Sequence, residues 1–349
     1  NIAVGITFVY QQVHNTKGGS LSSGNESDNP AYSVDLEFYK KLFNQARVFL
    51  HFETGDGAGA DNKLEVFSPV NCDANDSDNN ISITEALYEQ TFRNMPITLT
   101  LGRIDPTAYI DTNEYANDEN SQFLAGTFEN SPVIEFPDNS EGIHIGISSL
   151  GFISTDFIIM DGNSEEDNFF DNIFLAPQVN FKTSFFGKAG NYRLILWMNG
   201  CNHTEWGNAR RTKKKGYGAG VSFDQLLTEN TGMFLRYGWQ NPKVYLNGED
   251  FSLEHAFSVG IEFSGRAWAR NDDTFAIGLS GIIPSREYRK YLGRRGKSEK
   301  HIEICYNFRI NEHFSLSPDL QIIWSPYGND SVKGNDVIVV SGLRMQTEF

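Results

Sequence analysis

The chain is short of three things that mark common protein classes: cysteine, basic charge and long apolar runs. Three cysteines in 349 residues are too few for a disulfide scaffold, and none has a spacing typical of zinc ligands. We expect incidental thiols, with a Cys72–Cys201 bridge as the alternative. Only 29 Lys and Arg face 45 Asp and Glu, and this net charge of −16 argues against a nucleic-acid partner. No run reaches the ~18–20 apolar residues that a membrane-spanning helix requires.

The composition is also unusual in its balance of rings and aliphatic side chains. Aromatics make up 13% of the residues although the hydrophobic fraction is only 39%, below the roughly 45–50% of typical soluble domains. Disordered chains are poor in aromatics, so disorder is excluded as well. The chain begins at Asn1 inside a strand pattern, and we expect any secretory signal to have been removed.

Apolar and polar residues alternate along most of the chain, whereas helical spacing is rare. A period of two is the pattern of a strand with two different faces. We therefore predict about 16 strands, at 1–13, 31–40, 45–53, 83–92, 96–103, 142–150, 153–160, 174–184, 189–200, 213–224, 229–239, 253–264, 273–283, 301–309, 314–324 and 337–349.

The connections between these strands alternate between short turns and long loops, which is typical of outer-membrane barrels. We predict a single all-β domain over 1–349, a transmembrane antiparallel barrel with periplasmic turns and external loops. A soluble barrel or sandwich is the alternative, but its loops would rarely be so long and so rich in Asp and Asn. A barrel of this strand count encloses water, which explains the low apolar fraction. Aromatics are expected in the interfacial girdles: Tyr10, Trp197, Tyr237, Trp239, Trp268, Tyr306 and Trp324.

Three stretches carry a family likeness: 101–137, which opens Leu101-Gly102-Arg103-Ile104-Asp105-Pro106; 218–239, which contains Arg236-Tyr237-Gly238-Trp239; and 316–349, which ends in Phe349. They resemble the carbohydrate-selective porins of Gram-negative outer membranes, the glucose-type porins. The resemblance implies a homotrimer of 16-stranded barrels that admits sugars by diffusion. It also implies that the loop 104–141 folds inward as a constriction. The spacing in Asn113–Leu124 is compatible with a helix, and Pro132 and Pro137 punctuate the return of the loop.

Strand parity places rows of acidic and arginine side chains on the inward face, where they would line the solute path. Beside the constriction loop we favour Arg103, Asp105, Glu114 and Asp118. The other expected lumen residues are Arg47, Glu53, Glu85, Glu89, Arg193, Trp197, Arg236, Glu262 and Arg344.

Other chemistry is weakly indicated. Asp56 and Asp61 stand in a Gly/Asp run with hard oxygens for calcium, but the run lacks EF-hand spacing and is typical of solvated turns. The pairs His203/Glu205 and His301/Glu303 supply two ligands each, fewer than a metal site needs. We expect no metal, no cofactor and no enzymatic activity. The basic run 210–215 is expected in an external loop. It would bind lipopolysaccharide phosphates or a partner, or merely offset the negative charge of an acidic surface.

The sequence thus predicts an outer-membrane porin for sugars and similar small polar solutes. A general or cation-preferring pore is the first alternative, because acidic rings select cations. A structural or adhesive barrel with a plugged lumen is the second. Outer-membrane lipid and lipopolysaccharide are the expected surroundings.

Overall fold

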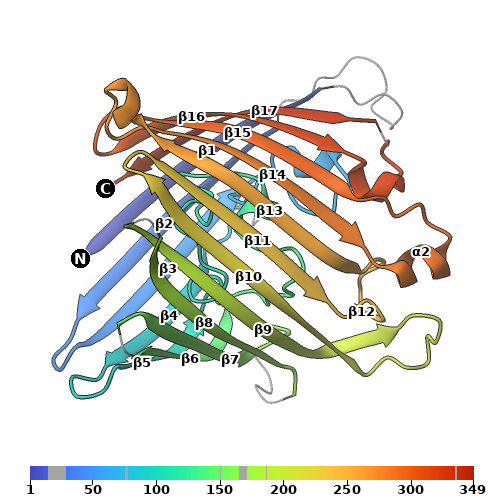
Figure 1. The fold of residues 1–349 in the computed structure, drawn as a ribbon, viewed down its shortest axis with the longest axis horizontal. Helices are drawn as coiled ribbons and strands as arrows, with labels where there is room; N and C mark the ends of the chain where they lie inside the picture. Colours follow the sequence, from blue (N-terminus) through green and yellow to red (C-terminus); the bar gives the residue numbers. More distant parts are fainter. Residues whose placement is uncertain (15–28, 75–77, 150, 165–170, 186, 335) are drawn as a thin grey trace.

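The computed structural model describes residues 1–14, 29–74, 78–149, 151–164, 171–185, 187–334 and 336–349. Its strands form one antiparallel sheet that closes on itself as a barrel (Figure 1). The closure lies at β1 (Ile2–His14), which pairs with both β2 (Asn29–Lys41) and β17 (Ile338–Glu348). Over these described ranges, sixteen strands follow one another around the ring. A further short strand, β12 (Val244–Leu246), pairs only with an extension of β9.

The other ring strands have the following bounds: β3 (Ala46–Asp56), β4 (Ser82–Thr91), β5 (Ile97–Ile104), β6 (Ser140–Ser149), β7 (Ile153–Asp161), β8 (Ile173–Phe185), β9 (Lys188–Glu205), β10 (Lys214–Thr228), β11 (Thr231–Gln240), β13 (Leu253–Ser264), β14 (Thr274–Pro284), β15 (Glu299–Arg309) and β16 (Phe314–Trp324). Helical turns are short: η1 (Asp61–Lys63), α1 (Gly126–Glu129), η2 (Gly265–Trp268), α2 (Arg286–Leu292) and η3 (Pro326–Asn329). In the described part of the chain, no helix is both long and apolar enough to cross a membrane.

These bounds confirm the all-β barrel and the predicted strands. The main differences are β9 and β10, which continue several residues past their predicted ends at 200 and 224. The strand β12 and the helix α2 were not predicted, because each lies within a connection whose composition indicated a loop. The short turns lie at the end of the barrel that also carries both termini, and the long connections lie at the other end (Figure 1). We call these the turn end and the loop end. Most of the predicted loop 14–30, residues 15–28, lies outside the described residues.

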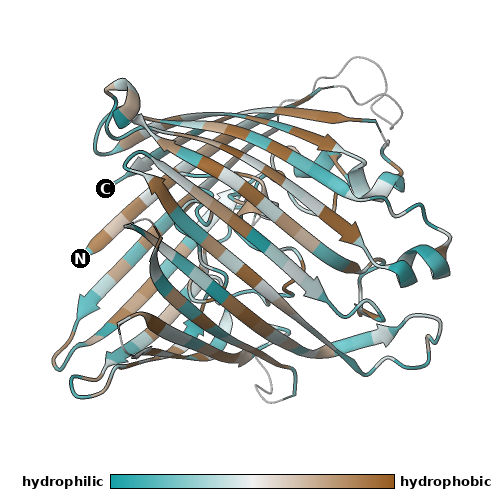
Figure 2. Cartoon of the chain, in the orientation of Figure 1, coloured by the Kyte–Doolittle hydropathy of each residue, from teal (hydrophilic) through white to brown (hydrophobic). Residues whose placement is uncertain are grey.

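Each strand has one buried face and one exposed face, as the alternation requires. On β11, Phe234 and Arg236 are buried inside the barrel, while Leu235 and Tyr237 are exposed on its outer surface. Brown apolar and paler or teal residues alternate along the strands in Figure 2, as this division requires. Trp197 is an exception to the predicted girdle. It alternates with the exposed Leu196 and is itself only 3% exposed, so its ring lies inside the barrel.

The outward apolar face predicts a depth-dependent sensitivity to charge. Leu194 is exposed on β9 and lies opposite Val179 and Val221, near the middle of the neighbouring strands. We expect Leu194→Arg to destabilise the barrel by about 2–4 kcal/mol, the cost of a basic side chain at the bilayer midplane. The measurement is urea unfolding of the protein in lipid vesicles. Tyr217→Arg, on the same outward face near the loop end, is the control and should cost at most about 1 kcal/mol. Equal losses would contradict this orientation.

Candidate functional site

Two connections turn inward from the loop end and occupy the lumen. One is the 105–139 loop between β5 and β6, and the other is the 57–74 segment that follows β3. In Figure 1 the 57–74 segment is light blue and the 105–139 loop is turquoise to green, both inside the barrel. Irregular backbone has no strand partner for its N–H and C=O groups, so the wall or the other loop must satisfy these groups. The inward side chains of the strands do so.

Arg236 is the central anchor of the 105–139 loop. Its side chain is 1% exposed, and its Nε donates to Asp111 Oδ1 at 3.2 Å. Nη1 donates to the carbonyl of Phe128 at 2.6 Å, and Nη2 to the carbonyl of Asp111 at 2.8 Å. The second carboxylate oxygen of Asp111 accepts from the Ser131 amide at 2.7 Å. One buried ion pair thus connects both arms of the loop to β11.

Further wall residues hold the same loop from other sides of the barrel. Glu303 of β15 accepts from the amides of Leu124 (2.6 Å) and Ala125 (2.9 Å). Arg344 of β17 donates to the carbonyls of Glu119 and Gln122. On β9, His203 Nε2 lies 2.9 Å from Glu135 Oε2. The loop is therefore fixed across the lumen between opposite walls.

Glycines on the inner wall leave room for side chains of the 105–139 loop. A Cβ on Gly232 would lie 2.1 Å from the ring of Tyr115, and one on Gly278 would lie 2.6 Å from the ring of Phe128. Both distances are shorter than any ordinary contact, so only glycine permits the loop to approach the wall this closely.

The predicted helical spacing in Asn113–Leu124 is wrong, because that segment forms turns, and the helical turn α1 follows it. Asn113 Oδ1 accepts from the Tyr115 amide at 3.2 Å, and Asp118 Oδ1 accepts from the Asn120 amide at 2.9 Å. Such local side-chain bonds compete with the helical hydrogen-bond pattern.

The 57–74 segment is a second inward element that the sequence reasoning missed. Glu299 of β15 accepts from the Phe67 amide at 3.0 Å, while Gln11 and Gln321 both donate to the Val70 carbonyl. The segment also bonds to the other loop: the Cys72 amide donates to the Leu124 carbonyl (2.9 Å), and the Gly126 amide donates to the Pro69 carbonyl (3.1 Å). Its run Leu64-Glu65-Val66-Phe67 was the available signal, because apolar residues are unusual in a solvated loop.

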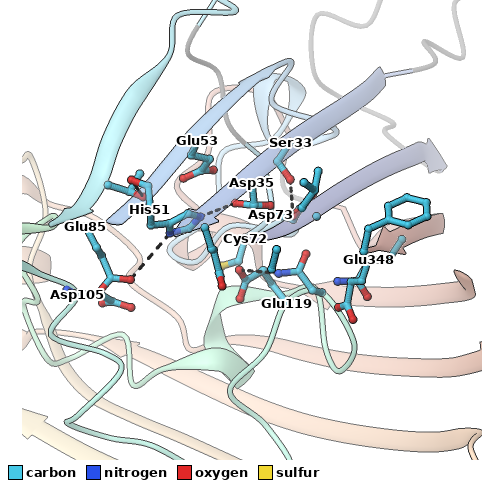
Figure 3. A pocket seen from close by; sticks show the side chains of 18 of the residues that line it. Ser33, Asp35, His51, Glu53, Cys72, Asp73, Glu85, Asp105, Glu119 and Glu348 are labelled. Atoms are coloured by element: carbon cyan, nitrogen blue, oxygen red, sulfur yellow. Dashed lines mark hydrogen bonds and ion pairs between the residues drawn. The ribbon is translucent and has the colours of Figure 1, made fainter. Parts of the chain in front are cut away.

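A polar cavity of about 680 Å³ remains between these loops and the wall made by β1 to β4. It extends from Glu348 and Phe349 at the turn end to Glu53, Asp73 and Asn139 nearer the loop end. Among the described residues, the only lining side chains that can become cationic are His51 and His313. Nine side-chain carboxylates line the cavity: Asp35, Glu37, Glu53, Asp73, Glu85, Asp105, Glu119, Glu312 and Glu348. Figure 3 shows His51 between Asp35 and Glu85, at 2.9 Å and 3.9 Å respectively.

Burial alters the ionisation of the loop carboxylates in this cavity. It raises the pKa of Asp73 to about 7, although the Ser33 hydroxyl donates to Asp73 Oδ1 at 3.0 Å. Burial also raises the pKa of Asp105, against the effect of the Thr107 hydroxyl and amide. The pKa of Glu119 is held well above its usual range by burial and by the nearby Glu129 carboxylate.

The predicted site residues separate into groups in the structure. Glu53, Glu85 and Asp105 line the acidic cavity. Glu262 lines a second cavity of about 640 Å³ near the turn end, together with Asp272 and Arg309.

Other predicted residues are engaged within the protein. Arg47 forms a bidentate pair with Glu89 at 2.7 Å, and Arg193 Nη1 lies 2.5 Å from Asp224 Oδ2. Arg236, Arg344 and Trp197 are almost fully buried.

The remaining three residues lie apart from both cavities. Glu114 is exposed on the loop, and Asp118 holds a turn with the Ser121 hydroxyl. Arg103 pairs with Glu141 and precedes the fully buried Ile104, so alternation places it on the outward face of β5.

The candidate calcium ligands are occupied by protein groups. Asp61 accepts from the amides of Val70 (2.8 Å) and Asn71 (3.1 Å), and Asp56 accepts from Asn79. No group of three or more His, Cys, Asp or Glu side chains suited to a metal occurs among the described residues. All three cysteines are free, so the alternative Cys72–Cys201 bridge does not form. His301 lies 2.8 Å from Glu299, and Glu303 accepts from the amides of Leu124 and Ala125, so both members of the His301/Glu303 pair are engaged by protein groups.

The sequence and the fold of this chain are both similar to those of known proteins. Residues 168–349 match the sequence profile described as "Carbohydrate-selective porin, OprB family". The chain belongs to this family. The matched part includes the 218–239 and 316–349 stretches of the likeness noted above, whereas 101–137 lies before it. The family is described as one of porins, and the closed β-barrel of this chain agrees with that description.

Individual relatives are distant in sequence. An uncharacterized protein of Aquifex aeolicus (strain VF5) is 27% identical over 248 residues, 71% of this chain and 63% of that protein. The chain thus matches less than two thirds of that curated relative. The fold resembles the high-pH structure of Pseudomonas putida OprB, with a TM-score of 0.81 at 15% identity over 100% of this chain and 94% of that one. It also resembles the outer-membrane channel DcaP of Acinetobacter baumannii (TM-score 0.62, 11% identity, 100% and 96% coverage).

The Arg236–Asp111 pair provides a test of how the loop is held. Arg236→Met leaves Asp111 buried without its cation, and breaking such a pair costs about 3–5 kcal/mol. We expect the 105–139 loop to leave the wall more often and to be cut faster by protease in the detergent-solubilised protein. The double variant R236M/D111N, which removes both charges, should be cut more slowly than the single variant. Unchanged cleavage in the single variant would contradict the anchoring role.

Proposed function

We propose that the chain is one outer-membrane porin domain through which sugars and similar small polar solutes diffuse passively. The observation that carries this proposal is the polar cavity lined by carboxylate, imidazole, hydroxyl and amide groups inside a barrel of the carbohydrate-selective porin family. A neutral sugar exchanges water for these hydrogen-bonding groups as it passes. Such contacts must be weak and numerous, because a pore that binds its solute tightly does not conduct it.

In this proposal the 105–139 loop is the constriction. Glu53, Glu85 and Asp105 contact the solute directly, and Glu262 belongs to the vestibule at the turn end. Arg193, Arg236 and Arg344 act on the path indirectly, since their guanidinium groups are already bonded to protein acceptors. Trp197 supports the loop rather than forming a sliding surface, and the Arg47–Glu89 pair borders the path.

Arg103 is assigned to the outward face of β5, and Glu114 and Asp118 to the turns of the loop, so none of the three contacts the solute.

The expected homotrimer is part of the proposal and is carried by the family likeness. Chemical cross-linking in native outer membranes tests it, because a monomeric barrel would give no three-fold product.

The transport proposal is tested by liposome swelling. Proteoliposomes placed in glucose, a disaccharide and progressively longer oligosaccharides should swell at rates that fall with solute size, since two inward connections occupy part of the lumen. Liposomes lacking protein are the control. Exclusion of every sugar, glucose included, would favour the structural or adhesive barrel with a plugged lumen.

We propose cation preference as a second property of the same path. The nine carboxylates of the cavity favour it, because charged rings at close range select ions of opposite sign. The arginines that would offset these carboxylates are engaged elsewhere: Arg236 and Arg344 bind the loop, and Arg193 pairs with Asp224.

A pH titration tests this preference through Asp73, whose pKa is about 7. Above that pH the carboxylate is ionised and attracts cations; below it the group is neutral. We expect the reversal potential in a KCl gradient to show weaker cation preference at pH 6 than at pH 8, and Asp73→Asn to reduce that difference. Glu229→Gln, which removes an exposed charge at a turn, is the matched control. Anion selectivity at pH 8 would contradict the assignment.

A further inference from the structure

The basic residues of this acidic protein are concentrated in two external segments. Residues 210–215 and 286–300 hold twelve of the 29 lysines and arginines, with only Glu287 and Glu299 as acidic members. Glu299 points into the barrel and is bonded to the amides of Phe67 and Tyr327. We call the lysines and arginines of these two segments the basic rim.

The two segments lie side by side although they are more than 70 residues apart in the sequence. A Cβ on Gly207 would lie 2.5 Å from the ring of Tyr291, so α2 packs directly against the β9–β10 connection. The rings of Trp206 and Tyr288 reinforce this contact, with centroids 6.2 Å apart. Figure 1 shows α2 and this connection together at the loop end, and both are largely teal in Figure 2.

Most of the positive charge on the basic rim is not neutralised by neighbouring carboxylates. Within the described residues, Arg211 and Lys214 are the members at ion-pair distance from an acid, and they share the single carboxylate of Glu205. Asp330 lies nearby, but its carboxylate accepts from the backbone amides of Arg295 and Gly296. The rim therefore presents a local positive field on a protein of net charge −16.

The basic rim continues onto the outward, lipid-facing side of the barrel. Lys300 pairs in register with Trp324 at the loop end of β15 and β16. A groove of about 520 Å³ lies between Lys297, Lys300 and the Trp324 ring. Lysine beside tryptophan at the end of the apolar band lies at headgroup depth, because aromatic girdles mark the membrane interface.

We propose that the basic rim binds the phosphate groups of the anionic glycolipid of the outer leaflet, lipopolysaccharide, with one phosphorylated sugar in the Lys297–Lys300–Trp324 groove. The loop end of an outer-membrane barrel faces the exterior, where this lipid lies. Ammonium and guanidinium groups supply charge-assisted hydrogen bonds to phosphate oxygens, and the indole covers the apolar part of the sugar. This interaction is independent of what passes through the lumen.

Binding of lipid A to the purified full chain in neutral detergent tests the proposal. Native mass spectrometry is performed with bisphosphorylated lipid A and with the same lipid after removal of its phosphates. We expect the bisphosphorylated form to bind and K297Q/K300Q to weaken it at least ten-fold, since each lysine near an anionic surface contributes about five-fold. The matched control K40Q/K41Q removes two exposed lysines from the turn end and should bind as the unaltered protein does.

Three results would overturn the proposal: equal binding of the dephosphorylated lipid, equal weakening by K40Q/K41Q, or displacement of lipid A by an equal concentration of inorganic phosphate. Heat-modifiable migration on gels verifies that each variant is folded. Because no solute transport is measured, failure here leaves the sugar proposal intact, and failure of sugar transport leaves this one intact.

Discussion

Irregular backbone inside a barrel is costly unless every buried N–H and C=O group finds a partner, and this requirement shapes the whole lumen. Many of these partners are acidic and basic side chains that project from the wall. Glu299 and Glu303 accept from loop amides, whereas Arg236 and Arg344 donate to loop carbonyls. Each is almost completely buried, and charge-assisted hydrogen bonds are among the strongest that a side chain can make.

The need to bond the buried backbone also determines which charges face the acidic cavity. Two arginines of the inner wall, Arg236 and Arg344, hold the 105–139 loop, and Arg47 and Arg193 pair with Glu89 and Asp224. None of these four lines the acidic cavity. Carboxylates of the β2, β3 and β4 wall remain beside that space, with His51 between Asp35 and Glu85. The acidity of the composition is therefore distributed unevenly: the cavity is negative and the exterior rim near α2 is positive.

Period-two alternation was sufficient to predict the strands, because each strand separates lipid from the interior and its pattern is local. The 57–74 segment was not predicted, since its contacts to Gln11, Glu299 and Gln321 join residues up to about 250 positions apart. For the same reason, parity placed Arg236 and Arg344 inside the barrel but could not reveal that the loop covers them. Arg103 was chosen for its place beside the 105–139 loop, although alternation from the buried Ile104 puts it on the outward face of β5.

The order of residues in these contacts has a consequence for assembly. The ring closes when β1 pairs with β17, so the last strand must be present before the cylinder exists. Glu299, Gln321 and Arg344, which hold the two inward connections, all lie in the final 51 residues. Filling of the lumen is thus a late folding step, dominated by contacts of very high sequence separation, which are slow to form. A barrel whose interior segments had not docked would present a wider and less selective opening than the one described.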